Sequence, residues 1–256
     1  MKVPRRAIAV LGLALLVGWN PEGLLAAPGG AVPDVLSIVR KLDGNEVYTT
    51  IKAEAEFRIT FGGKKIVKRF TLQARGARNS FIEFTNPEDA GTRYLKRDGS
   101  LFLYSPDAEE VIPITGHLLK ESMMGSDLSY EDAAGNDTLE GLYNARIAEE
   151  GELDGRPVWV LDMTGKSKTI SYPRLKIWAD KETFIPLKTE RYALSGALLK
   201  EEYVRETRRI GGRTFPVRVE VKDLLRKDSM TVFTLDKVEL DVPIPDSVFS
   251  MRNLQR

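Results

Sequence analysis

Residues 46–61, EVYTTIKAEAEFRITF, show the pattern from which the fold is predicted. From Ile51 to Phe61 the odd positions carry apolar side chains, and the even positions between them carry polar or charged ones. A period of two places alternate side chains on opposite faces of a strand, so one face of this strand is predicted to be buried. The predicted strand has about sixteen residues, whereas strands of five or six are usual.

The residues that follow continue this pattern. Gly62-Gly63 is typical of a hairpin turn, and residues 65–74 return with apolar side chains again on alternate positions. Further short runs are separated by turn dipeptides such as Asp98-Gly99, Asp154-Gly155 and Gly211-Gly212. We therefore predict a mainly β protein, an antiparallel meander of about eleven strands in which consecutive strands are neighbours. No change of composition divides residues 28–256, which are predicted to form a single domain.

Two segments depart from the strand pattern. Val35, Ile38, Val39 and Leu42 have helical spacing, with an acidic residue before them and Gly44 after them, and this predicts an N-terminal amphipathic helix. Residues 117–135 show no alternation. Within them, a serine followed three residues later by an aspartate predicts a capped helical turn that ends near Gly135. We call residues 117–135 the insert.

The N-terminus has the pattern of a secretory signal peptide. Lys2, Arg5 and Arg6 precede an apolar run of about eleven residues, which is too short to span a bilayer. We predict a signal peptide over residues 1–27, cleaved near Ala26 or Ala27, and export to the periplasm. An uncleaved N-terminal anchor is the alternative.

Composition excludes several function classes. The chain has 38 basic and 37 acidic residues; residues 1–27 hold three basic and one acidic, which leaves 35 and 36, a charge of −1. This balance does not favour nucleic acid as a partner. With no cysteine and one histidine, the chain cannot form disulfides, Cys-based zinc sites or thiol nucleophiles.

The strand pattern alone leaves two architectures open. Long strands with one apolar face can pair as a filled sandwich, or curl into an incompletely closed barrel whose mouth is covered by the helix and the insert. A barrel too wide to be filled by its own side chains leaves a cavity, and an apolar cavity suits an acyl chain.

A resemblance favours the barrel. The decapeptide MMGSDLSYED, residues 123–132, is similar to the M-M-G-S-D-[FL]-S-Y-E-D block of bacterial outer-membrane lipoprotein-sorting proteins, which are relatives of the LolA carrier and the LolB receptor. The order of the remaining segments also resembles that family. The resemblance implies an incompletely closed β-barrel with helical plugs and a cavity for lipid or lipoprotein acyl chains.

The resemblance also implies partners. A LolA-like carrier would receive its cargo from an inner-membrane donor complex and pass it to an outer-membrane receptor. The lipid-modified cysteine of the LolB receptor has no counterpart here, and this favours a monomeric soluble carrier. The alternative is a lipid-sensing envelope module without transfer activity, because the fold also resembles the sensing domain of a sigma-factor regulator.

The candidate lipid-contacting residues are the apolar side chains of the insert and two tryptophans: Leu118, Leu119, Met123, Met124, Leu128, Tyr130, Trp159 and Trp178. Methionines adapt to irregular apolar ligands, so the insert is interpreted as a lid over acyl chains. A packed plug is the alternative for the insert, and core packing is the alternative for the tryptophans.

No catalytic residue, cofactor or metal site is predicted. His117 has no recognisable nucleophile partner in the sequence, so a hydrolase would have to depend on Asp, Glu or Ser. The acidic residues Asp127, Glu131 and Asp132 are interpreted as helix caps and turn residues rather than as metal ligands.

Overall fold

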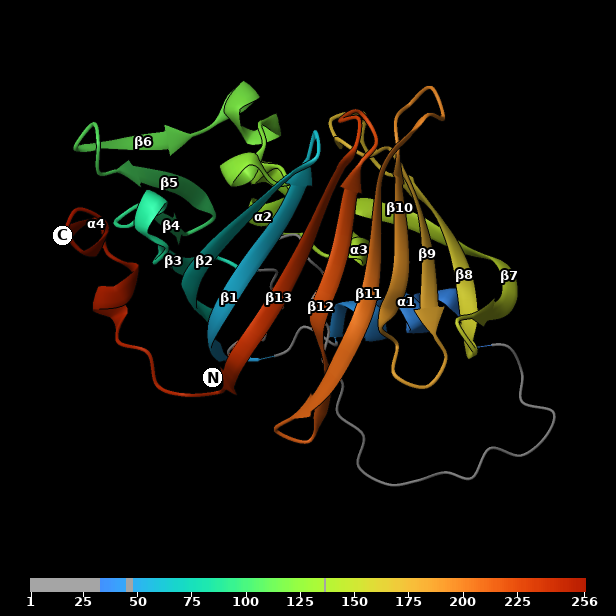
Figure 1. Ribbon diagram of the computed structural model, residues 1–256. Coiled ribbons are helices and arrows are strands. Elements are labelled where there is room, and N and C mark those ends of the chain that lie inside the picture. The colour runs from blue at the N-terminus through green and yellow to red at the C-terminus, as the bar shows by residue number, and fades with distance from the viewer. Residues whose placement is uncertain (1–32, 45–47, 136) are drawn as a thin grey trace.

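The computed structural model describes residues 33–44, 48–135 and 137–256. Its main feature is one antiparallel sheet of thirteen strands (Figure 1). The strands are β1 (Thr50–Phe61), β2 (Lys64–Arg75), β3 (Asn79–Phe84), β4 (Arg93–Arg97), β5 (Ser100–Ser105), β6 (Glu110–Ile114), β7 (Tyr143–Leu153), β8 (Arg156–Gly165), β9 (Arg174–Asp180), β10 (Pro186–Tyr192), β11 (Leu198–Ile210), β12 (Arg213–Asp223) and β13 (Ser229–Leu240).

The sheet is a meander with one long-range pairing. Its order is β6-β5-β4-β3-β2-β1-β13-β12-β11-β10-β9-β8-β7, so the first and last strands of the chain pair at the centre. Strands β6 and β7 are the two edges and do not pair with each other, so the barrel is incompletely closed, as predicted. The sandwich alternative is wrong, because the described residues form one sheet and not two. The predicted count of about eleven strands is low by two: β3 to β6 have only five or six residues each, and such short runs show few alternations.

The first strand of the meander, β1, is shorter than the strand predicted from the sequence. Strand β1 begins at Thr50, four residues later than predicted, and residues 45–47 lie outside the described residues. Its neighbours set this limit, because β2 ends at Arg75 and β13 ends at Leu240, opposite the start of β1. Before that point, the backbone N–H of Thr49 donates to the Asp241 carboxylate at 2.7 Å, so a side chain replaces the strand partner.

The predicted N-terminal helix is confirmed as α1 (Val35–Gly44). Its apolar stripe of Ile38, Val39 and Leu42 is completely buried against β7, β8 and β9. We call the face of the sheet that α1 covers the inner face, and the opposite face the outer face.

The insert lies against the same inner face, over the other half of the sheet (Figure 1). It consists of η2 (Gly116–Lys120), η3 (Met123–Gly125) and α2 (Tyr130–Ala134). Helix α3 (Leu139–Leu142) follows it and packs on the cluster beneath α1. The predicted cap is confirmed: the Ser129 side chain accepts from the backbone of Asp132, the Asp132 side chain accepts from the backbone of Ser129, and α2 ends at Gly135. Three further short helices are η1 (Pro87–Asp89), η4 (Asp246–Phe249) and α4 (Met251–Leu254), the last two packing on β3 and β4.

Two apolar clusters therefore fill the inner face. One lies between the insert and β1, β2, β12 and β13, where the Phe57 ring is 4.9 Å from that of Phe70 and 5.5 Å from that of Phe233. The other lies beneath α1. Within the described residues, none of the helices has the length and apolar character that crossing a membrane requires.

Candidate functional site

Six of the eight candidate residues meet at one place. Met123 and Leu128 lie in the cluster between the insert and the inner face, and each is only 1% exposed. The other four, Leu118, Leu119, Met124 and Tyr130, are half-buried and pack against the same cluster. The insert thus presents a continuous apolar underside to the sheet, and in this structure it occupies the concave side as a packed plug.

The methionine pair lies at a strained turn. Met124 has a φ of 54°, in the left-handed region that side chains other than glycine rarely adopt. Its sulfur lies 3.1 Å from the Tyr94 hydroxyl, which is also 3.2 Å from the Tyr130 hydroxyl. Burial raises the pKa of the Tyr94 hydroxyl, so it stays protonated as a donor. These contacts fix the tip of the insert over β4.

The two tryptophans lie apart from the insert. Trp159 is on the inner face beneath α1, stacked on Phe184 with ring centroids 5.5 Å apart. Trp178 is on the outer face, because it pairs in register with Val160, whereas its neighbour Ile177 faces α1. The amine of Lys188 lies 4.6 Å from the Trp178 ring. The structure therefore brings neither tryptophan to the insert.

A cluster of buried charges fastens the insert to the sheet. The Asp132 carboxylate accepts hydrogen bonds from the amine of Lys200 on β11 at 2.6 Å and from the hydroxyl of Tyr172 at 2.9 Å. The same amine also donates to the backbone oxygen of Asp127 at 3.0 Å. The side chains of Lys200 and Asp132 are 7% and 1% exposed, so this ion pair is desolvated. Such a pair is strongly destabilising to break, although its net contribution is small.

A second ion pair stands beside the first. Arg191 on β10 donates to Glu202 on β11 at 2.8 Å, and its guanidinium is 4.0 Å from the Asp132 carboxylate. Burial alone would raise the pKa of Asp132, but the positive charges of Arg191 and Lys200 outweigh it and hold the pKa below its usual value. For Glu202, burial prevails over Arg191, and the pKa is raised. Two acidic side chains, Asp132 and Glu202, and two basic ones, Lys200 and Arg191, share this site. We call these four residues the charged cluster.

Further polar contacts hold the rest of the decapeptide. The Asp127 carboxylate accepts from the Thr231 hydroxyl on β13 at 2.6 Å and from the backbone of Asp223 at 3.2 Å. Arg226 donates to the backbone oxygens of Gly125, at 3.0 Å, and of Ser126. The polar residues of the decapeptide are thus positioning residues, and its apolar residues form the underside.

Sequence reasoning found one of the four residues of the charged cluster and missed the other three. It assigned Asp132 to helix capping, which is confirmed, but did not anticipate its bond to Lys200, 68 residues away. A signal was present in β11, where Lys200 and Glu202 occupy alternate positions that belong to the inner face together with Val204. Opposite charges at positions expected to be apolar indicate a buried pair.

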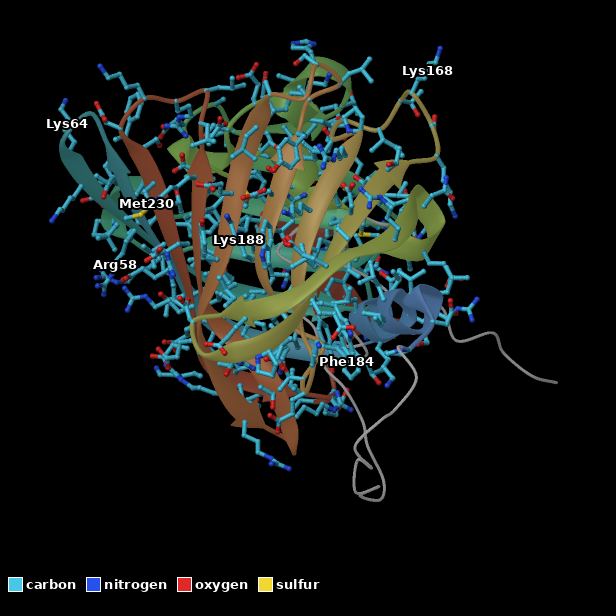
Figure 2. The ribbon with its side chains drawn as sticks, turned by 90° about the vertical axis from the view of Figure 1, so that its right-hand side faces the viewer. Arg58, Lys64, Lys168, Phe184, Lys188 and Met230 are labelled. Carbon is cyan, nitrogen blue, oxygen red and sulfur yellow. The ribbon has the colours of Figure 1, made fainter. Side chains whose placement is uncertain are left out.

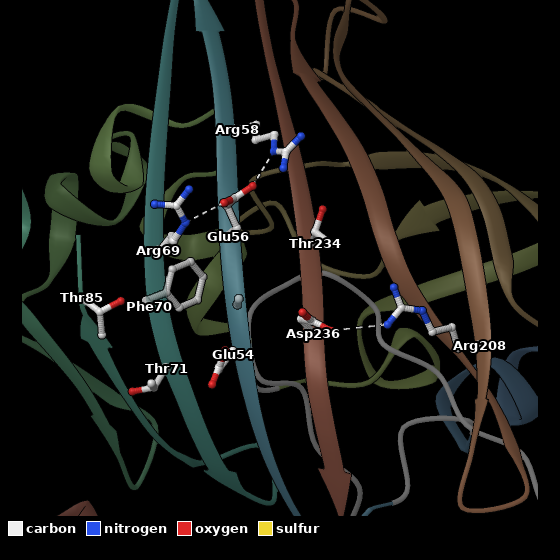
Figure 3. A pocket seen from close by; sticks show the side chains of 11 residues that line it. Glu54, Glu56, Arg58, Arg69, Phe70, Thr71, Thr85, Arg208, Thr234 and Asp236 are labelled. Carbon is white, nitrogen blue, oxygen red and sulfur yellow. Dashed lines mark hydrogen bonds and ion pairs between the residues drawn. The ribbon is translucent and has the colours of Figure 1, made fainter.

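Other candidates lie outside this site. His117 is exposed on η2. In the part of the chain that the structure describes, His, Asp and Glu side chains form no group of three that could hold a metal ion. A pocket of about 500 Å³ opens on the outer face of β1, β2 and β13 (Figure 3). Its charges pair with one another, as in Glu56 with Arg69 at 3.0 Å and Asp236 with Arg208 at 3.7 Å, so we assign no function to it.

Solved structures share this architecture. A DUF1329 family protein from Desulfovibrio piger has a TM-score of 0.78 and 26% identity, covering 85% of this chain and 96% of its own. A Vibrio parahaemolyticus domain named for outer membrane lipoprotein sorting has a TM-score of 0.77 and 19% identity, covering 86% and 98%. A LolA superfamily protein from Nitrosomonas europaea has a TM-score of 0.71 and 22% identity, covering 87% and 100%.

The sequence comparisons give the family. No curated protein matches the chain. A family model with the description uncharacterized protein matches residues 76–256, which include β3 to β13, the insert and the charged cluster. The chain therefore belongs to that family, and its fold is similar to that of the LolA superfamily.

Proposed function

We propose that this protein carries lipid or lipoprotein acyl chains through the periplasm and takes part in their sorting towards the outer membrane. The observation that carries the proposal is the apolar underside of the insert, seated on the inner face of an open, LolA-like sheet. If the insert moves away, the inner face exposes aromatic and aliphatic side chains that an acyl chain can cover in its place.

The energetic need for a carrier is large. Burying one methylene group contributes about 0.8 kcal/mol, so a ~16-carbon chain in water costs about 12 kcal/mol. The cluster beneath the insert holds Phe57, Phe70, Phe84 and Phe233, and an acyl chain among these rings recovers much of that cost. Met123 and Met124 suit a variable cargo, because unbranched thioether side chains adapt to irregular surfaces.

The cellular setting belongs to the same proposal. Residues 1–27, which lie outside the described residues, act as a signal peptide cleaved near Ala26 or Ala27, and residues 28–256 form one lipid-binding domain. The protein works as a monomer between an inner-membrane donor complex and an outer-membrane receptor. We propose no catalytic role, since the carboxylate of Asp132 is already engaged by Ser129, Lys200 and Tyr172.

Acyl-chain binding can be tested directly. Purified protein should take up a dansyl-labelled fatty acid, and native mass spectrometry after mild purification should show bound lipid. Leu119→Asp with Met124→Asp should weaken probe binding at least tenfold, because a charge in an apolar site is costly. Met230→Asp is the matched control (Figure 2). Met230 is a half-buried methionine on the outer face, paired in register with Thr60. This substitution should change probe binding by less than about twofold.

Two results would reject the carrier. Protein that shows a lipid-free mass and no probe uptake does not bind acyl chains. Protein that binds lipid but transfers none, and that purifies with one stable inner-membrane protein, is a sensing module and not a carrier.

A further inference from the structure

Three hairpin turns lie together at one end of the sheet, at the top of Figure 1. They connect β1 to β2, β10 to β11 and β12 to β13. Seven large apolar side chains are exposed among the described residues, and six of them lie on or beside these turns. The six, which we call the apolar rim, are Phe61, Ile66, Val67, Leu194, Leu224 and Leu225.

The rim side chains project into solvent one at a time, and two of them are highly exposed. Leu194 is 88% exposed and Leu225 is 76% exposed, each near the tip of its own turn. Single exposed apolar side chains are common on folded proteins, so the distinguishing feature here is that six of them gather at one end of the sheet. Because the apolar side chains stand on separate tips, they suit a deformable surface better than a rigid complementary one.

Unpaired lysines surround the apolar rim. Lys64 and Lys65 follow the first turn, Lys227 lies in the third, and Lys168 lies in the neighbouring loop between β8 and β9. Figure 2 shows Lys64 and Lys168 at the same end of the molecule. None of these four lysines forms an ion pair with a described acidic side chain. The three turns contain one acidic residue, Asp228, which is exposed.

The opposite end of the sheet differs. There several basic side chains are paired with acids: Arg75 with Asp246, Arg156 with Asp180 at 2.8 Å, and Arg213 with Asp241 at 3.3 Å. The net charge of the chain is only +1, so the positive character of the rim is a local property. Exposed leucines among free lysines form the combination that binds an anionic lipid interface.

The apolar rim is joined to the insert. Arg226, in the same turn as Leu224 and Leu225, lies over the Phe61 ring at 4.8 Å and donates to the Gly125 oxygen at 3.0 Å. The turn that carries Leu224 and Leu225 is therefore bonded directly to the insert.

We propose that the apolar rim docks this protein on an anionic lipid bilayer, with the leucines of the hairpin turns in the interface and the lysines against the headgroups. Each lysine near an anionic surface contributes about a fivefold factor to binding, and each leucine that leaves water contributes about tenfold or more. The proposal goes beyond acyl-chain binding, since docking requires no cargo.

Vesicle sedimentation tests the docking. Purified protein is mixed with vesicles of phosphatidylcholine alone or of equal parts phosphatidylcholine and phosphatidylglycerol, at low and at physiological salt. We expect binding to the anionic vesicles that weakens as salt rises. Leu194→Ser with Leu225→Ser, and separately Lys64→Glu with Lys65→Glu, should each reduce that binding at least tenfold.

Two control variants match these changes at other places. Leu36→Ser alters the exposed large apolar residue that the described part of the chain has outside the rim, on α1. Arg209→Glu alters an exposed basic residue at the opposite end. Both should bind vesicles within about twofold of wild type. All these substitutions are at exposed positions, and unchanged unfolding in urea shows that the variants remain folded.

Three outcomes would overturn the docking proposal. They are no binding to anionic vesicles at low salt, equal binding to both kinds of vesicle, or rim variants that bind as wild type does. In the first case the rim would instead be a surface for a protein. The proposed carrier function is tested separately, because probe uptake needs no vesicle and Leu119→Asp with Met124→Asp leaves the rim intact.

Discussion

Two segments cover the inner face of this sheet, and they are held by different forces. Helix α1 is held over β7 to β9 mainly by an apolar stripe whose members are fully buried. The insert also packs by apolar contacts over β1, β2, β12 and β13, but it is fixed by the charged cluster and by hydrogen bonds of Asp127 and Arg226. Apolar contacts act without direction, whereas buried ion pairs act only in one geometry.

The difference in these forces indicates which of the two segments, α1 or the insert, can leave the sheet. Separating α1 from the sheet exposes apolar surface, and no new interaction offsets that free-energy cost. Separating the insert exposes apolar surface too, but under the proposed function an acyl chain takes its place, and water can solvate Asp132 and Lys200 once they part. We therefore regard α1 as a permanent part of the core and the insert as the removable part.

The largest effect is expected at the charged cluster. Lys200→Met leaves the Asp132 carboxylate buried without its closest cation, and the free energy of unfolding should fall by about 3–5 kcal/mol. Urea unfolding measures the loss, and amide hydrogen exchange should locate it in the insert. Lys176→Met is the control, since its 3.4 Å pair with Glu149 is solvent-exposed and should matter by less than about 1 kcal/mol. Equal losses in the two variants would mean that the cluster does not hold the insert.

A smaller effect is expected at α1. Leu42→Ala should lower the free energy of unfolding by about 3 kcal/mol, because it leaves a cavity beneath the helix. Hydrogen exchange should increase in α1 and β7 to β9 and remain unchanged in the insert. Leu36→Ala, at the exposed leucine of the same helix, should cost less than about 0.5 kcal/mol. Faster exchange in the insert of the Leu42 variant would remove the distinction between the two covers.

The smallest effect concerns pH. The pKa of Asp132 is lowered in the folded state, so its contribution is complete above the unfolded value of about 3.9 and is lost as the pH falls through the folded value. Asp43, which accepts from the backbones of Leu139 and Glu140, behaves oppositely, because burial raises its pKa and acid favours its folded form.

Urea unfolding between about pH 6 and about pH 3 measures both contributions. Relative to wild type, the acid-induced loss of stability should be smaller in Asp132→Asn and larger in Asp43→Asn. The same acid dependence in all three proteins would show that neither carboxyl group couples its cover to pH.

The amino-acid sequence alone predicts most of the elements of this protein. The period-two pattern from Ile51 to Phe61 predicts a strand with one buried face, and helical spacing with a following Gly44 predicts α1. The cap of Ser129 with Asp132 follows from spacing as well. These features are local, because each depends on residues within a few positions of one another.

How the two faces of the sheet are used depends on tertiary contacts, which the sequence pattern does not contain. Alternation cannot tell that Trp178 faces outward while Trp159 faces α1, that Lys200 meets Asp132, or that three distant turns form one rim. The physical reason is that a strand pattern divides side chains between two faces, but what covers each face depends on contacts between residues far apart in the chain.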